Sequence, residues 1–140
     1  MTGIESLSIF RFSPLYYNDV TQILLNTGGS QLYIDGQLRF IAASMDDKID
    51  SLALVACYHD ITVGYAVVRF YEWNRLAKIR GLAIDTSVNM QEHAAALMNE
   101  IEDFAISKRS RGIYAETPAT NIRVRAFYKR RGYVEDHLMT

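Results

Sequence analysis

Residues 121–133 read NIRVRAFYKRRGY, and the interpretation of the fold starts from this stretch. Asn121 stands seven residues before Tyr128, and Gly132 and Tyr133 follow that tyrosine four and five positions later. The pattern predicts a short helix over residues 121–130, which Asn121 can cap, and then a strand from Tyr133 to residue 139. The stretch is also the densest basic region of the chain, and a solvated helix face is its simplest interpretation: Arg123, Arg125, Lys129, Arg130 and Arg131.

The residues before this stretch predict several strands and one long helix. Three consecutive strands are expected at Leu52–Tyr58, Ile61–Tyr71 and Leu76–Ile84. The second of them is apolar in both alternating sets, which is typical of a central strand covered on both faces. Asn89 and Glu92 have the spacing of a capping box at a helix start, and Gly112 is expected to end this helix. Ile113–Thr117 then predicts another short strand.

The N-terminal part predicts one strand and two helices. Leu7–Phe12 reads as a strand, and Pro14 marks the start of a helix that NTGG at residues 26–29 should stop. A second helix is expected between Gln31 and Ala43. Strands that come first in a group and later alternate with helices indicate an α/β fold, with a mixed sheet covered by helices on both faces. The length fits a single domain over residues 1–140.

The C-terminal half, roughly residues 61–140, resembles the GNAT superfamily of N-acetyltransferases. The four matched positions in residues 121–133 carry most of this likeness. GLAID at residues 81–85, followed by the long helix, is similar to the family's central strand and cofactor helix, and ETPATN at residues 116–121 resembles its strand-to-helix turn. The resemblance implies a GNAT acyl-CoA N-acyltransferase-like fold and acetyl-CoA as cosubstrate. It also implies acetyl transfer to a primary amine of a small molecule or peptide, by direct attack in a ternary complex.

The resemblance assigns roles to individual residues. Tyr128 takes the role of the general acid that protonates the leaving thiolate. Asn121 borders the pantetheine arm of the cofactor. The backbone of one strand segment would pair with the pantetheine amides, as a pseudo-strand added to an exposed edge: Leu82, Ala83 and Ile84.

Each proposed role has a simpler alternative. Tyr128 is one of nine tyrosines, and its ring could merely pack a helix against the sheet. Asn121 could be no more than the cap of the helix that follows it. Glu72 ends the central predicted strand, near where several family members place a general base, and it is the first candidate for that role. Glu116, at the end of a later predicted strand, is the second candidate. For both, an exposed charge at a strand end is the simpler interpretation.

The start of the long helix departs from the family pattern. A GNAT pyrophosphate loop carries a basic residue or glutamine and then glycines, which let backbone N–H groups at the helix N-terminus approach the phosphates. Here Met90 adds bulk and Glu92 adds negative charge. The cofactor is therefore expected to meet an altered loop: Asn89, Met90, Gln91, Glu92, His93, Ala94 and Ala95. A second hypothesis follows, a catalytically inactive GNAT-fold module with a binding or regulatory role.

Composition restricts the remaining possibilities. The formal net charge of -1 argues against a nucleic-acid partner, and no apolar run is long enough to span a membrane. Cys57 is the single cysteine and no leader sequence is evident, so a cytoplasmic location is expected. No His, Cys, Asp and Glu grouping has metal-ligand spacing, so no metal is expected. We also expect a homodimer, because an uncovered edge at the last strand would favour aggregation.

Overall fold

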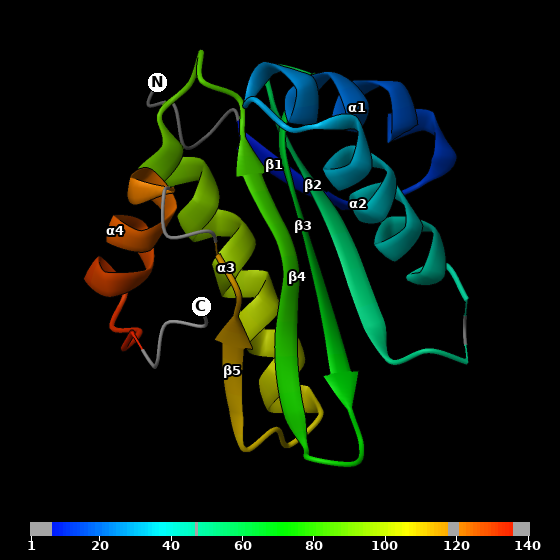
Figure 1. The fold of residues 1–140 in the computed structure, drawn as a ribbon, viewed down its shortest axis with the longest axis vertical. Helices are drawn as coiled ribbons and strands as arrows, with labels where there is room; N and C mark the ends of the chain where they lie inside the picture. Colours follow the sequence, from blue (N-terminus) through cyan, green and yellow to red (C-terminus); the bar gives the residue numbers. More distant parts are fainter. Residues whose placement is uncertain (1–6, 47, 118–120, 136–140) are drawn as a thin grey trace.

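The described residues form a mixed sheet with helices on both of its faces (Figure 1). The computed structural model describes residues 7–46, 48–117 and 121–135. Within these ranges five strands pair in chain order: β1 (Leu7–Arg11), β2 (Ser51–Tyr58), β3 (Ile61–Tyr71), β4 (Leu76–Ile84) and β5 (Gly112–Ala115). Neighbours from β1 to β4 are antiparallel, whereas β4 and β5 are parallel because a helix connects them.

The helices form one layer on each face of the sheet (Figure 1). The first layer holds a 3-10 turn η2 (Pro14–Tyr16) and the helices α1 (Tyr17–Asn26) and α2 (Gln31–Ala43). The second layer holds α3 (Met90–Ser107) and α4 (Ile122–Arg130). The α/β class, the mixed sheet and the two helical layers confirm the prediction from the sequence.

Each helical layer closes an apolar cluster against the sheet, and β3 contributes to both clusters. Tyr65 and Val67 of β3 pack toward α1 and α2, whereas Ala66 and Val68 pack toward α3. These alternating side chains point to opposite faces of the sheet, and all four are buried. The prediction that β3 is a central strand is therefore confirmed. None of the described helices combines the length and apolar character needed to cross a membrane.

The long helix ends earlier than the sequence suggested. The expectation that Gly112 ends it is wrong, because α3 stops at Ser107 and Gly112 opens β5. The stop is made by Arg109, which has a left-handed backbone with φ of 55°. The N–H groups of Arg109 and Ser110 donate to carbonyls of the last turn at 2.9 and 3.0 Å, which is the Schellman pattern that glycine usually provides.

Two other element ends differ from expectation. β5 ends at Ala115 rather than at Thr117. Of the strand expected over residues 133–139, residues 133–135 have no strand conformation, and the remainder lies outside the described residues. The sheet therefore ends with β5 in the part of the chain that is described.

Arg109→Gly should raise the free energy of unfolding by about 0.5–1 kcal/mol. A left-handed backbone costs an L-residue roughly 1–2 kcal/mol, and glycine removes this cost. Glycine also has more conformational freedom in the unfolded chain, which offsets part of the stabilisation. The Arg109 side chain is exposed, so its loss removes little packing. Urea denaturation measures the change. Gly132→Ala is the matched control, because Gly132 has φ of 99° after α4 and the variant should be less stable than the parent. A lower free energy of unfolding in both variants would contradict the prediction.

Candidate active site

The site lies where β4 and β5 separate. The two parallel strands pair only as far as Ile79 and Ala115. The next residue, Arg80, is an extra residue in β4, because the register with β3 shifts by one at this point. Such a bulge bends a strand and increases its local twist. Residues 80–84 consequently have no strand partner on the β5 side within the described ranges, and this edge of β4 is open.

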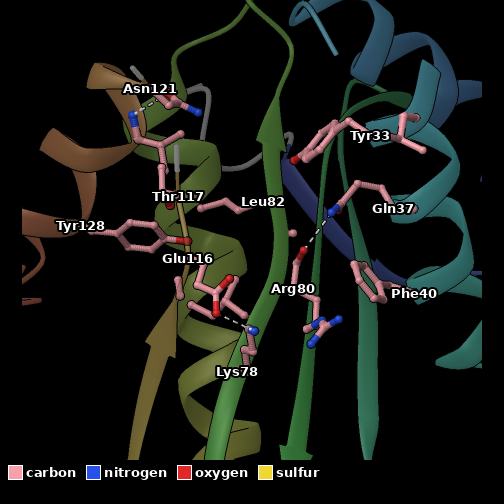
Figure 2. A pocket seen from close by; sticks show the side chains of 16 residues that line it. Tyr33, Gln37, Phe40, Lys78, Arg80, Leu82, Glu116, Thr117, Asn121 and Tyr128 are labelled. Atoms are coloured by element: carbon pink, nitrogen blue, oxygen red, sulfur yellow. Dashed lines mark hydrogen bonds and ion pairs between the residues drawn. The ribbon is translucent and has the colours of Figure 1, made fainter. Parts of the chain in front are cut away.

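A cavity of about 290 Å³ lies beside the open edge (Figure 2). Its walls come from α2, from β4, from the residues that follow β5, and from α4. That volume suits part of a small ligand, and polar groups from several elements converge on it. The side chains able to take part in binding or chemistry are Tyr33, Gln37, Lys78, Arg80, Glu116, Thr117, Asn121 and Tyr128.

Tyr128 extends into the cavity from α4 (Figure 2). Its hydroxyl makes no hydrogen bond with any described residue, so the O–H is available to a ligand. Burial raises the pKa of the Tyr128 phenol above its ordinary value. The phenol therefore keeps its proton at neutral pH, which is the state that a general acid needs.

The turn after α4 fixes the ring of Tyr128. Gly132 adopts a left-handed backbone, and its N–H donates to the carbonyl of Lys129 at 3.0 Å. The N–H of Tyr133 donates to the carbonyl of Tyr128 at 2.9 Å, which completes a Schellman motif. The rings of Tyr133 and Tyr128 then pack with centroids 5.4 Å apart. The Tyr133 hydroxyl donates to Glu102 of α3 at 2.9 Å, so Tyr128 is positioned through α3.

Arg131 strengthens the same connection between α4 and α3. Its Nε and Nη2 atoms donate to the two carboxylate oxygens of Glu102 at 3.0 and 2.8 Å, and Nη2 also donates to Asn99 at 2.6 Å. The hydrogen bonds from Arg131 lower the pKa of Glu102, so the carboxylate stays ionised at neutral pH. A bidentate pair of this kind fixes both distance and orientation.

A buried amide holds β4 at the bulge. Gln37 of α2 is 5% exposed, and its Nε2 donates to the carbonyl of Arg80 at 3.0 Å. Its Oε1 accepts a hydrogen bond from the Tyr65 hydroxyl at 2.5 Å. These bonds satisfy polar groups that are shielded from water. Gly81 is required here, because a Cβ at this position would overlap the Gln37 amide oxygen and the Tyr65 hydroxyl.

Charged side chains line the part of the cavity nearest Ile79. Lys78 donates to Glu116 at 2.9 Å, and this hydrogen bond lowers the pKa of the Glu116 carboxyl. Arg80 lies over the ring of Phe40 at 3.9 Å from the centroid, and it donates to the Tyr71 hydroxyl at 2.9 Å. The cavity therefore combines one carboxylate with two cations.

The chain matches a known family over most of its length. The sequence pattern of the acetyltransferase (GNAT) family fits residues 18–133. The chain belongs to this family.

The fold of this GNAT protein is similar to those of several solved structures. The paiA N-acetyltransferase from Thermoplasma acidophilum, in complex with coenzyme A, is 18% identical with a TM-score of 0.77, over 94% of this chain and 92% of that chain. Ard1 from Thermoplasma volcanium is 21% identical with a TM-score of 0.74, over 94% and 85%. The ribosomal-protein-S18-alanine N-acetyltransferase from Escherichia coli is 14% identical with a TM-score of 0.73, over 94% and 79%. No curated protein matches the sequence. At these identities the structures establish the fold alone.

The structure brings four of the residues singled out from the sequence to one cavity. Leu82, Asn121 and Tyr128 all line it, and so does Glu116. Asn121 also caps α4, because its side chain accepts from the N–H of Val124 at 3.3 Å. The capping role and the cavity position are therefore compatible in this GNAT protein.

Other residues singled out from the sequence lie away from the cavity wall. Ala83 and Ile84 belong to the open edge of β4, but their side chains pack into the apolar clusters on opposite faces. Glu72 lies in the turn after β3, where its 80% exposed side chain pairs with Arg75 at 3.3 Å. Because β3 runs antiparallel to β4 and β5, its C-terminal end lies at one end of the sheet and theirs lie at the other. That opposite direction keeps Glu72 apart from Tyr128.

The start of α3 lies outside the cavity lining, and its own residues cap it. Asn89 accepts from the N–H of Glu92 at 3.3 Å, which uses one of the free donors of the first turn. His93 is 3% exposed and packs against the Tyr58 ring at 5.3 Å between centroids. Its Nδ1 lies 2.7 Å from the Asn89 carbonyl oxygen.

The other residues of this segment divide between core and surface. Ala94 is buried and Met90 partly buried, both in the cluster beneath α3. Gln91 is exposed, and its amide oxygen can accept from the guanidinium of Arg130, the last residue of α4. Ala95 is half-buried.

The sequence interpretation missed the α2 wall of the cavity. Tyr33, Gln37 and Phe40 come from this helix. A signal was present, because Gln37 lies at helical spacing between the buried residues Ile34 and Ile41. A polar residue inside such an apolar stripe has to find a buried partner.

Gly81→Ala should lower the free energy of unfolding by about 1–3 kcal/mol, because the new methyl group displaces the Gln37 amide from its buried hydrogen bonds. Gln37→Ala removes the atoms that this methyl would overlap. The double variant should then be more stable than the sum of the two single changes implies. Urea denaturation of the four proteins measures the coupling, and additive effects would show that the amide does not require the glycine.

Proposed function

We propose that this protein is an N-acetyltransferase that moves the acetyl group of acetyl-CoA to a primary amine of a small molecule or peptide. The observation that carries the proposal is the Tyr128 hydroxyl, which has no partner among the described residues and points into a cavity beside the open edge of β4. Membership of the GNAT family supports the acyl transfer. The raised pKa of Tyr128 supports its role as an acid.

The proposed reaction is a direct attack in a ternary complex. Acetyl-CoA supplies the thioester, and the amine nitrogen attacks the carbonyl carbon as the carbon–sulfur bond breaks. Tyr128 gives its proton to the leaving sulfur and later regains one from solvent. Holding both substrates in one cavity replaces an encounter in solution by a reaction between positioned groups.

The proton released by the amine needs an acceptor. Glu116 is supported by its place in the cavity wall, and its lowered pKa means that it is ionised at neutral pH. Glu72 was the first candidate from the sequence, but it has only its position after β3 in its favour. We therefore propose Glu116, acting directly or through a water molecule, as the group that receives the proton.

The open edge of β4 supports the binding of a CoA ester. Residues 80–84 offer backbone groups to which an amide-containing arm can add as a pseudo-strand, beside Asn121. The start of α3 fits phosphates less well, because Asn89 occupies the N–H of Glu92 and Glu92 adds negative charge. That second observation favours the alternative function, a catalytically inactive module that uses the GNAT fold for binding or regulation.

Acetyl-CoA should raise the melting temperature of the protein. A ligand that binds only the folded state at about one hundred times its Kd stabilises that state by about 2.7 kcal/mol. The Glu92→Gln variant should bind acetyl-CoA more tightly than the parent protein, since it removes a negative charge from the segment expected to meet the phosphates of acetyl-CoA. The absence of any shift at millimolar acetyl-CoA would contradict the enzyme. Clear binding without turnover on a broad panel of amines would support the inactive module.

Tyr128→Phe should lower kcat by roughly 10²–10⁴-fold, the usual contribution of a positioned general acid. The melting temperature should change little, because the ring remains and the hydroxyl has no hydrogen-bond partner to lose within the described residues. Steady-state kinetics and a thermal melt of the same preparation provide the two measurements. Tyr133→Phe is the control, since it removes a hydroxyl that binds Glu102 and should cost stability. Full activity of Tyr128→Phe would exclude the assignment.

We also propose a cytoplasmic location and a homodimer. Cys57 is buried and forms no disulfide, which is compatible with a reducing compartment. The outer edge of β5 carries no further strand in the described residues, and pairing between two copies would cover it. Light scattering at high protein concentration tests the dimer, and a monomeric mass would exclude it.

A further inference from the structure

Two arginines from neighbouring strands face α2 at one end of the cavity. Arg69 of β3 and Arg80 of β4 both line a small hollow of about 20 Å³, together with Phe40, Ser51 and Tyr71. Arg80 also lines the main cavity, into which Tyr128 extends from α4 (Figure 2). A ligand that reaches Tyr128 can therefore extend toward these two guanidinium groups.

Neither the Arg69 nor the Arg80 guanidinium has a carboxylate within ion-pair distance in residues 7–46, 48–117 and 121–135. Glu116 also lines the cavity, but its hydrogen bond goes to Lys78, and Arg80 makes only the smallest contribution to the lowering of the Glu116 pKa. Both arginines are half-buried, and a cation that has lost part of its hydration is stabilised when an anion binds to it.

The two guanidinium groups are held in place before any ligand arrives. Arg80 stacks on Phe40 at 3.9 Å and donates one N–H to the Tyr71 hydroxyl at 2.9 Å. Arg69 lies over the Tyr71 ring at 4.9 Å from its centroid. An arginine has five N–H donors in a planar fork, so further donors of Arg80 remain for a bidentate contact with an oxyanion. The hydroxyl of Ser51 is buried without a hydrogen-bond partner and adds a donor in the same hollow.

We propose that the acceptor amine carries an anionic group, a carboxylate or a phosphate, which Arg69, Arg80 and Ser51 bind. This inference rests on the proposed acetyl transfer, with the amine directed toward Tyr128 and the anion toward α2. The same cations repel an acceptor that has several positive charges and no anion. The two arginines would therefore favour acceptor amines that carry an anion and disfavour acceptor amines that carry several positive charges.

Matched amine pairs test the proposal by acetyl transfer. γ-Aminobutyrate is compared with its amide, and phosphoethanolamine with ethanolamine. We expect kcat/KM to be about tenfold higher or more for the anionic member of at least one pair, because charge-assisted bidentate contacts are the strong ones. The pair that shows the preference identifies the anion. Equal turnover of both members in both pairs would overturn the proposal.

Variants assign the preference to the hollow. Arg80→Met and Arg69→Met should each remove most of it, and Arg80→Lys should keep part of it because the charge remains without the fork. Arg39→Met is the matched control, since Arg39 is an exposed arginine on α2 outside both cavity linings, and it should keep the full preference. Thermal melts show whether each variant is folded. A preference unchanged in both folded arginine variants would refute the assignment.

Equilibrium binding separates a failure of this inference from a failure of the proposed function. The same amines are titrated into the protein by calorimetry without acetyl-CoA. If no amine is acetylated but the anionic member binds more tightly and Arg80→Met abolishes the difference, the anion site stands and the transferase does not. If amines are acetylated with no advantage for an anion in turnover or in binding, the transferase stands and the anion site does not.

Discussion

The pairing between β4 and β5 stops at Ile79, and the candidate active site is organised around this interruption. Backbone N–H and C=O groups that leave a sheet still require hydrogen-bond partners. The protein supplies one of them at the bulge, where Gln37 donates to the carbonyl of Arg80. The bond needs a buried amide on α2, and the oxygen of that amide accepts a hydrogen bond from the Tyr65 hydroxyl. The two groups together leave no room for a side chain at position 81. The remaining open groups of β4 are the ones to which the proposed function adds an extended ligand.

The proposed acid, Tyr128, lies on the other side of that opening, and the end of α4 holds it there. A Schellman motif ends α4. Tyr128 is the third residue from the end of the helix, and Gly132 and Tyr133 are the two residues that follow the C-cap Arg131. Their spacing in the sequence is thus the spacing of a helix end, in which the glycine permits the left-handed turn and the second aromatic ring packs on the first. Glu102 and Arg131 then attach this end to α3. A motif that reads as a family signature is also a device for orienting one hydroxyl.

The parts of the fold that could be predicted depend on local patterns. The two apolar faces of β3 follow from side-chain periodicity, which the core enforces. The helix expected between Gln31 and Ala43 is present as α2, although Gly36 interrupts its pattern. The end of α3 could not be predicted, because Arg109 takes a left-handed conformation that tertiary contacts impose without a glycine to mark it. The Gln37 contact joins residues far apart in the chain, so local periodicity could suggest a buried polar group but not its partner. The choice between Glu72 and Glu116 needed the strand directions, since the ends of antiparallel neighbours lie at opposite edges of a sheet.

In the proposed function, the bulge links the cofactor side of the site to the acceptor side through a single residue. A bulge re-aims the side chain of the residue it inserts, and here that residue is Arg80. Its carbonyl is held by Gln37 and its guanidinium stacks on Phe40, and these two partners are three positions apart on α2 and therefore share one face of that helix. The distortion that opens the edge of β4 thus also directs the Arg80 cation toward the side where the proposed acceptor would bind. Changes on α2 would therefore alter the proposed acceptor side without moving Tyr128, because α4 is anchored separately to α3.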